Sequence, residues 1–197
     1  METWVEELPK KKFFSRVNTT ECLVTISMLV SNRIDTVEKC FESFRPLLEQ
    51  IPSEFIAVDT VGDEKSDGSV DVARKYADKI VHFEWCDDFA AARNAGLKEA
   101  RGKWLIYLDD DEWFDDPQEI IKFFITGEYQ KYNSASYIVR NYMDPNGNNY
   151  IDSYPSRMVK LNSSIHFVGR IHEFLTPFCE PRKEFNDFVH HYGYVYK

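Results

Sequence analysis

The chain has 197 residues, 43% hydrophobic and 15% aromatic, so it is long enough to bury one core as a single domain. Its net charge of −9, without an offsetting stripe of lysine and arginine, argues against a partner that is a nucleic acid. The four cysteines lie far apart without a CxxC pair, which excludes a zinc knuckle and a disulfide framework. No signal peptide and no apolar run of transmembrane length is recognisable, so we expect a cytoplasmic protein.

Residues 1–21 precede the first long apolar run, and we expect them to form an N-terminal arm. Their basic stretch PKKKFFSR (9–16) is short and has Trp4 and two phenylalanines around it. A contact with an anionic surface is one interpretation of this stretch. A frayed arm is the one we expect, because the basic stretch is isolated at the chain end.

From residue 22 to about residue 132, apolar runs of strand length alternate with helical patterns. The expected strands are CLVTISMLV (22–30), EFIAVDT (54–60), IVHFEW (80–85) and KWLIYLD (103–109). They are apolar on both faces, which is typical of a mostly parallel sheet covered by helices. The sequence therefore predicts an α/β fold.

The expected helices carry recognisable start and stop signals. They are DTVEKCFESFRPLLEQI (35–51), SVDVARKYADKI (69–80), DDFAAARNAGLKEA (87–100) and DPQEIIKFFITG (116–127). In the first, Asp35 and Glu38 have the spacing of a capping box, and Pro46 should bend or shorten the helix. In the last, Pro117 lies in the first turn and Gly127 is the stop.

After about residue 133 the pattern changes to aromatic-rich strands separated by polar turns. The strand-like segments are ASYIVRNYM (135–143), NYIDSYPSRMVKL (149–161), SIHFVGRIHEFL (164–175) and FNDFVHHYGYVY (185–196). We therefore expect one domain over residues 22–197, with an α/β half (22–132) followed by a β-rich half (133–197).

Acidic residues recur where the expected parallel strands end. Asp59 ends one strand, Asp87 and Asp88 follow the next, and Asp109–Asp111 follow the last. Ligands of open α/β sheets bind at the carboxyl ends of the strands, so three acidic strand ends favour a shared ligand site. Aspartate also caps helices and forms turns, which is the alternative for each end taken alone.

Arg93 falls on the expected core-facing stripe of its helix, four residues from both Phe89 and Leu97. A buried guanidinium requires a charged partner. Two interpretations stay open from the residues alone. Arg93 either forms a structural ion pair with Asp59 or Asp88, or helps to hold a nucleotide and its phosphates near the helix N-terminus.

The motifs SMLVSNR, FIAVDT…SDGS, DDFAAARNAGL, WLIYLDDDEW, GRIHEF and HHYGY occur in an order that resembles glycosyltransferase family 2. The resemblance covers roughly residues 22–197. Within this family, the chain is similar to the catalytic domain of bacterial members that often carry tetratricopeptide repeats downstream. The resemblance implies a GT-A fold and a hexosyltransferase-type enzyme that uses a nucleotide-sugar donor, with a UDP-sugar expected.

The resemblance also implies roles for residues of the nucleotide site. Backbone groups of Leu29, Val30 and Ser31 would line the nucleotide, and Asp59 would recognise the uracil ring. Arg93 and Asp109 would belong to the same site, with Asp110 near the ribose. The loop TVGDEKSDGS is longer and more acidic than the family pattern, so its contacts do not follow from the resemblance.

Asp109 and Asp111 are similar to the DxD motif of the family, with Asp111 expected as the direct metal ligand. His191 corresponds to a late histidine ligand, and His190 is the competing choice. Mn²⁺ or Mg²⁺ suits such hard carboxylates. The ion would neutralise charge on the leaving diphosphate.

Glu173 is the candidate catalytic base, with His172 second. A base opposite the leaving group would deprotonate the acceptor hydroxyl and give inversion. The alternative for the IHE segment is a strand end with a structural histidine. Arg157 is expected either to contact acceptor or phosphate, or to be a surface arginine on a strand. The acceptor, whether a glycan, a protein or a lipid-linked sugar, is not identified by the residues.

The residues also bear on two other classes of function. A calcium-binding loop in DEKSDGSVDVAR fails because Lys65 and Arg74 stand where oxygen ligands are required. A catalytically inactive domain that binds sugar nucleotides or another protein is the alternative to an enzyme.

Overall fold

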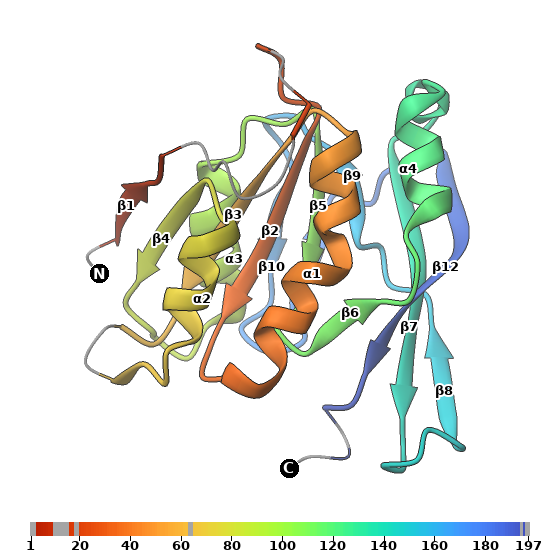
Figure 1. Ribbon diagram of the computed structural model, residues 1–197. Helices are drawn as coiled ribbons and strands as arrows, with labels where there is room; N and C mark the ends of the chain where they lie inside the picture. The colour runs from red at the N-terminus through yellow and green to blue at the C-terminus, as the bar shows by residue number, and fades with distance from the viewer. Residues whose placement is uncertain (1–2, 10–15, 18–19, 63–64, 194, 196–197) are drawn as a thin grey trace.

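A ten-stranded mixed sheet runs through the residues that the computed structural model describes, 3–9, 16–17, 20–62, 65–193 and 195 (Figure 1). Its strands follow the spatial order β1-β4-β3-β2-β5-β9-β7-β12-β6, and β8 pairs with β7. A separate two-stranded sheet is formed by β10 and β11. The mixed sheet and its covering helices confirm the predicted fold class.

Four neighbouring parallel strands form the centre of the sheet. They are β2 (Val24–Val30), β3 (Ser53–Asp59), β4 (Lys79–Phe83) and β5 (Trp104–Leu108). Every residue of β2, β4 and β5 is buried, as expected for strands covered on both faces. These are the four strands that the apolar runs predict.

Helices cover both faces of this centre. They are α1 (Ile34–Gln50), α2 (Ser69–Tyr76) and α3 (Phe89–Lys98). A fourth helix, α4 (Gln118–Ile125), packs against β12 of the other half, and a short 3-10 helix η2 (Glu128–Lys131) follows it. Figure 1 shows α1 and α2 on one face and α3 on the other. Side chains alternate between the faces of a strand, so Met28 packs in the large core beneath α1, whereas Leu29 packs against Ala92 of α3.

The helix signals are partly confirmed. Asp88 caps α3, where its Oδ1 accepts a hydrogen bond from the Ala91 amide at 2.9 Å. The capping box predicted for α1 does not form, because the helix begins at Ile34, and the Ile34 amide donates to Asp67 from the next loop at 3.0 Å.

The first helix has nearly the predicted bounds, and the second does not. Pro46 does not shorten α1, which continues to Gln50. Burial of Leu47 and Leu48 in the core offsets the backbone hydrogen bond that proline removes. The second helix is shorter than expected: α2 ends at Tyr76, and Ile80 belongs to β4.

The β-rich half extends the sheet beyond β5 and adds the smaller sheet. Its strands are β7 (Ser134–Tyr142), β8 (Tyr150–Ser153), β9 (Met158–Lys160), β10 (His166–Val168), β11 (Phe174–Thr176) and β12 (Arg182–His191). Strand β6 (Glu112–Phe114), which the sequence did not indicate, pairs antiparallel with β12. The Asn94 side chain joins α3 to β10, since it donates to the Phe167 carbonyl at 2.9 Å and accepts from the Phe167 amide at 2.8 Å.

The N-terminal segment differs most from expectation. Residues Thr3–Glu7 are not frayed but form β1, an edge strand that pairs antiparallel with β4. Most of the basic stretch, residues 10–15, lies outside the described residues. Arg16 is described and pairs with Asp78 at 2.5 Å. Among the described helices, none is both long and apolar enough to cross a membrane.

Candidate active site

The predicted site residues gather where β2, β3 and β5 end. The parallel register places Val30 beside Asp59, and Asp109–Asp111 directly follow β5, the other neighbour of β2. The strand-end acids of β3 and β5 therefore flank the end of β2, as the sequence predicts. The acids after β4 have other partners: Asp88 caps α3, and Asp87 accepts from the Trp85 indole at 3.1 Å.

Asp110 joins the end of β5 to the turn after β2. Its Oδ2 accepts hydrogen bonds from the Ser31 amide at 2.6 Å and the Ser31 hydroxyl at 2.7 Å. Burial raises the pKa of Asp110 to about 6; the bonds from Ser31 lower it, and the neighbouring acids Asp111 and Asp109 raise it further. Leu29 and Val30 are buried, and the Val30 carbonyl accepts from the Thr60 amide at 3.1 Å, so Ser31 is the most accessible of the three predicted lining residues.

Asp109 is held between two arginines, the buried Arg93 and the largely buried Arg157, whose side chains are 2% and 12% exposed. Arg93 donates to one of its carboxylate oxygens, and Arg157 donates to the other at 3.0 Å. Burial alone would raise the pKa of Asp109, but Arg93 and Arg157 hold it well below its usual range. Asp109 therefore stays charged because the protein supplies its counter-charges.

Arg93 is only 2% exposed and connects three elements of the site. Besides Asp109, it contacts the Leu108 carbonyl at 2.9 Å and Glu173 Oε1 at 2.9 Å. The structural interpretation that pairs Arg93 with Asp59 or Asp88 is wrong, since its partners are Asp109 and Glu173.

Arg157 belongs to this cluster, and the alternative of a surface arginine on a strand is wrong, since its side chain is 12% exposed and it precedes β9. Its guanidinium contacts Glu112 Oε1 at 2.5 Å as well as Asp109, and the Tyr107 ring lies 4.8 Å from Arg157 and 5.0 Å from Arg93. Burial raises the pKa of Glu112 to about 7, although Arg157 opposes this shift. Arg157 enters the site because β9 pairs with β5, a register that the sequence does not encode locally.

Asp111 faces different partners from those of Asp109. Its carboxylate lies 3.4 Å from the Arg33 guanidinium and 3.7 Å from His191 Nε2. Burial alone would lower the pKa of His191, but the hydrogen bond and charge of Asp111 raise it above its usual value. His190 points elsewhere, with Nδ1 2.7 Å from the Tyr142 hydroxyl and Nε2 3.3 Å from Asp115. Of the two candidate histidines, His191 is the one beside the acid cluster.

The predicted metal ligands are brought together only in part. Within the described residues, no group of three or more histidines, cysteines and acids has metal-binding geometry. Asp109 is engaged by Arg93 and Arg157, which leaves Asp111 and His191 as the pair that could hold an ion.

Asn141 fixes the orientation of the His191 ring. Its side-chain oxygen lies 2.8 Å from His191 Nδ1, while its amide nitrogen donates to the carbonyls of Val139 and Ile151 at 3.1 Å each. These two carbonyls orient the amide, so its oxygen accepts from a protonated Nδ1, and Nε2 is the coordinating nitrogen on the Asp111 side. Such a pair fits a divalent ion that takes its remaining ligands from phosphates and water.

Asp59 lies at the predicted strand end but is 1% exposed. Its Oδ1 accepts from the amides of Val61 at 2.9 Å and Gly62 at 3.0 Å, and its Oδ2 lies 2.9 Å from His82 Nδ1. Direct recognition of a base by Asp59 stays a prediction, and in this structure its oxygens already have protein donors. A hollow of about 660 Å³, bordered by Trp4, lies next to it.

The two candidate catalytic residues are placed differently. Glu173 directly precedes β11, and Arg93 holds its carboxylate beside the acid cluster. His172 is exposed and has a positive φ of 58° in the same turn. The geometry therefore favours Glu173 over His172 as the group that faces the cluster.

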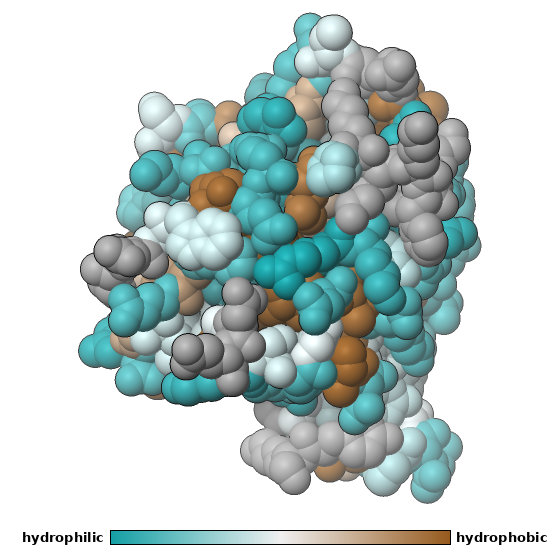
Figure 2. Space-filling model, turned by 60° about the vertical axis from the view of Figure 1, so that its left-hand side comes forward, coloured by the Kyte–Doolittle hydropathy of each residue, from teal (hydrophilic) through white to brown (hydrophobic). Residues whose placement is uncertain are grey.

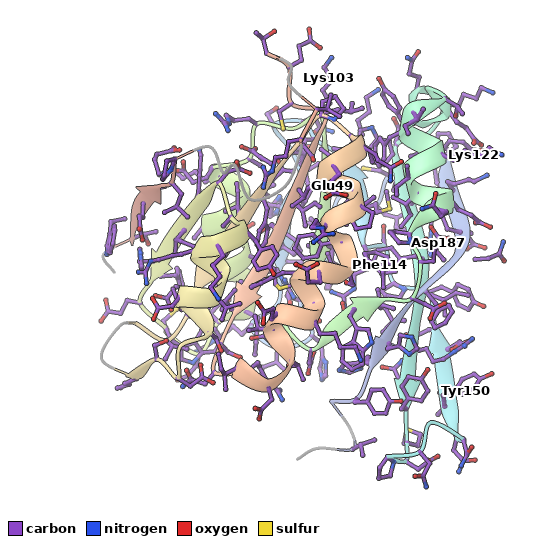
Figure 3. All side chains as sticks on the ribbon, viewed as in Figure 1. Glu49, Lys103, Phe114, Lys122, Tyr150 and Asp187 are labelled. Carbon is purple, nitrogen blue, oxygen red and sulfur yellow. The ribbon has the colours of Figure 1, made fainter. Side chains whose placement is uncertain are left out.

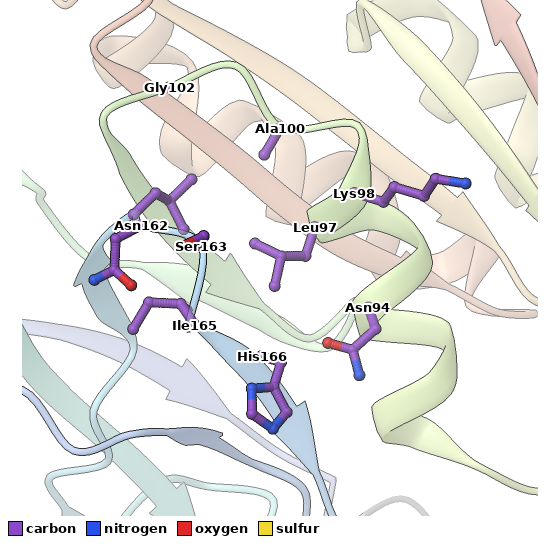
Figure 4. A pocket seen from close by; sticks show the side chains of 10 residues that line it. Asn94, Leu97, Lys98, Ala100, Gly102, Asn162, Ser163, Ile165 and His166 are labelled. Atoms are coloured by element: carbon purple, nitrogen blue, oxygen red, sulfur yellow. The ribbon is translucent and has the colours of Figure 1, made fainter.

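A second hollow, of about 500 Å³, lies between α3 and the segment that leads to β10 (Figure 4). Leu97, Asn162 and His166 line it, and it extends to Gly102 at the amino end of β5. None of the predicted site residues borders it. It is separate from the strand-end cluster.

Comparison with known proteins identifies the family to which the chain belongs. Residues 25–179 match the model of glycosyl transferase family 2. The glycosyltransferase SunS of Bacillus subtilis is 24% identical over 155 residues, which cover 76% of this chain and 34% of SunS. A TPR repeat-containing protein of Synechococcus elongatus is 30% identical over 89 residues, which cover 45% of this chain and 20% of that protein. The chain thus spans about a third or less of the length of these relatives.

The fold has a counterpart among solved structures. The mannosyltransferase PcManGT of Pyrobaculum calidifontis, solved with GDP-Man and Mn²⁺, superposes with a TM-score of 0.50 at 18% identity, over 66% of this chain and 40% of that chain. Together with the family match over most of the sequence, this likeness confirms the predicted GT-A fold. The chain belongs to glycosyltransferase family 2.

Proposed function

We propose that the chain is a metal-dependent, inverting glycosyltransferase that moves a sugar from a UDP-sugar to an acceptor hydroxyl. The observation that carries this proposal is the pair Asp111–His191 at the carboxyl edge of the parallel strands, beside the charged cluster of Arg93 and Asp109. Family membership supports transfer from a nucleotide sugar. The metal, the uracil base and inversion are our proposals.

Donor binding follows from the groups at the strand ends. Ser31 and Asp110 form a polar corner after β2 and β5, which suits the ribose. Arg33, half-exposed and 3.4 Å from Asp111, is a cation within reach of a diphosphate placed at that acid. Asp59 organises the loop at Val61 and Gly62, where the base would lie.

Asp111 and His191 Nε2 would hold Mn²⁺ or Mg²⁺, and Asn141 keeps the histidine ring in the required orientation. When bound, the ion supplies charge neutralisation for the leaving diphosphate. Asp109 acts through Arg93 and Arg157 rather than as a ligand, because two guanidiniums already occupy its oxygens.

Glu173 is the residue we assign to the acceptor side. Arg93 orients its carboxylate through the 2.9 Å contact, and a carboxylate placed there would accept the proton of the acceptor hydroxyl. Attack from the side opposite the diphosphate inverts the anomeric carbon.

The metal part of the proposal is tested by Asp111→Asn. In the wild type, UDP at a hundred times its Kd with Mn²⁺ should stabilise the fold by about 2.7 kcal/mol. The variant should lose this Mn²⁺-dependent stabilisation while its apo form stays folded. Asp116→Asn is the matched control, because Asp116 is exposed and lies outside the cluster. Equal Mn²⁺-dependent UDP binding by Asp111→Asn would contradict the assignment.

The base of the donor is tested separately with UDP, GDP and ADP under the same conditions. We expect UDP to bind most tightly. Equal binding of the three nucleotides would remove the uracil part of the proposal and leave the metal part intact. Turnover of the matching sugar nucleotide would distinguish an enzyme from a domain that only binds it.

A further inference from the structure

The hollow beside Asp59 is built by three strands at the edge of the nucleotide site. It has a volume of about 660 Å³ and is bordered by Trp4 of β1, by the end of β3 and the loop after it, and by the end of β4. This size lies within the usual range of small-molecule sites, roughly 300–1,000 Å³. Figure 2 turns the flank with β1 forward and shows a mainly hydrophilic surface with small, separated hydrophobic areas.

The Asp59 carboxylate, which borders the hollow, already accepts hydrogen bonds from the protein. Both oxygens of Asp59 have protein partners, and one of these is His82, which also borders the hollow. A ligand in the hollow therefore meets other groups first. Two of these are the half-exposed indoles of Trp4 and Trp85.

Trp4 is 52% exposed but firmly positioned. Its ring stacks on His82, with ring centres 3.7 Å apart and planes 15° apart, and the pairing of β1 with β4 sets the two residues opposite each other. His82 is itself held by Asp59 at 2.9 Å and contacts Glu6 at 3.4 Å. Trp4 is thus an exposed aromatic ring whose orientation is fixed before any ligand binds.

We propose that Trp4 is the stacking surface for the base of the nucleotide donor, and that β1 completes the nucleotide site of this chain. The inference rests on the proposed function and adds a residue to its donor site. Every nucleobase has a planar face, so stacking on an indole contributes affinity without selecting the base. Trp4 should therefore strengthen the binding of UDP and GDP alike, whereas base selection belongs to polar groups of the hollow.

The test compares wild type with Trp4→Ala and Trp4→Phe by calorimetric titration with UDP, GDP, uridine and Mn²⁺–pyrophosphate. Loss of a stacked base should weaken UDP, GDP and uridine roughly five- to hundredfold in Trp4→Ala. Pyrophosphate binding should not change, because it uses only the metal and phosphate groups. Trp4→Phe retains an aromatic face and should lose less.

Indole fluorescence provides a second measurement that does not depend on Trp4→Ala being folded. UDP should quench the emission of the wild type, and Trp4→Phe should lose most of that quenching. The proposal is overturned if the quenching is unchanged in Trp4→Phe, if folded Trp4→Ala binds UDP as tightly as wild type, or if it loses pyrophosphate to the same extent. Failure of the wild type to bind either UDP or pyrophosphate with Mn²⁺ would instead overturn the proposed function.

Discussion

The parallel half of the sheet and the half added after β5 differ in how they are buried. The parallel strands β2, β4 and β5 have no exposed residue, whereas in β8 three of the four residues are exposed. Tyr150 of β8 lies on the projecting β7–β8 hairpin, far from the helices (Figure 3), and Ile151 is 62% exposed. Judged by β8 alone, the second half would be an attachment to a finished core, although Tyr137, Met158 and Val189 of that half are buried in the large core.

The charged cluster contradicts that view. The parallel half supplies the acids Asp109 and Asp111, but much of what holds them comes from the other half: Arg157 next to β9 and His191 at the end of β12. Glu173 joins them through Arg93. The second half is therefore part of the electrostatic structure of the site, and variants can separate this role from its exposed surface.

The largest effect should come from Arg157→Met. The substitution keeps much of the side-chain length but leaves Glu112, whose side chain is 1% exposed, and the partly exposed Asp109 without one counter-charge. Breaking a buried ion pair in this way costs about 3–5 kcal/mol of unfolding free energy. Denaturant unfolding measures the difference.

Arg140→Met is the matched control in the same half. Arg140 pairs with Asp152 on the exposed hairpin, with both contacts at 2.9 Å. Neither partner of this pair is as buried as Glu112: the side chains of Arg140 and Asp152 are 22% and 24% exposed. Solvent therefore screens the pair, and the control should be less destabilised than Arg157→Met. Equal losses in the two variants would show that the second half stabilises the fold only through general packing.

A smaller effect, on rate and not on folding, is expected for Glu173→Gln. The change preserves shape and removes the charge that accepts a proton, so transfer to an acceptor should fall by ~10²-fold or more. Donor and Mn²⁺ affinity should be retained, which titration with UDP can verify. Steady-state transfer assays give kcat.

His172→Asn is the control for Glu173, because His172 lies in the same turn but is exposed. It should retain most of the activity. If Glu173→Gln transfers normally while His172→Asn is inactive, the base has been assigned to the wrong residue, and the metal and nucleotide parts of the proposal are unaffected.

The smallest expected effect concerns pH and the junction between α4 and β12. Asp187 lies on β12 beside α4 (Figure 3) and accepts from the Ile120 amide at 2.9 Å. Burial raises its pKa from 3.8 to about 6, although the backbone bond opposes this shift. Because the pKa of Asp187 is higher in the folded than in the unfolded state, folding favours its protonated form. The contribution of protonated Asp187 to the unfolding free energy is complete below pH 3.8 and is lost as the pH rises through about 6.

Asp187→Asn should remove that pH dependence. The unfolding free energy of the wild type, relative to the variant, should fall between pH 4 and pH 7 by on the order of 1 kcal/mol, since nearby solvent screens the effect. Urea titrations at several pH values measure the difference. A difference that rises with pH would mean that the hydrogen bond to the helix start dominates over burial.

Features encoded by short segments could be predicted from the sequence. The four parallel strands, the Asp88 cap and the acids at strand ends all follow from local periodicity and residue type. The position of Arg157 beside Asp109 and Glu112 could not be predicted, because it depends on the pairing of β9 with β5. The same is true of the contact between Asp59 and His82, which lie on neighbouring strands 23 residues apart in the chain.

The edge strand β1 has a consequence for the behaviour of the protein in solution. Without it, β4 would present a row of unpaired backbone groups, and such open edges promote aggregation. With it, the outer edge carries the charged residues Glu6 and Glu7, which pair with Arg74 at 3.1 Å and Lys79 at 3.3 Å. Truncation of the first eight residues would therefore be expected to lower solubility, even though Val5 and Leu8 are the only described residues it removes that pack against the core.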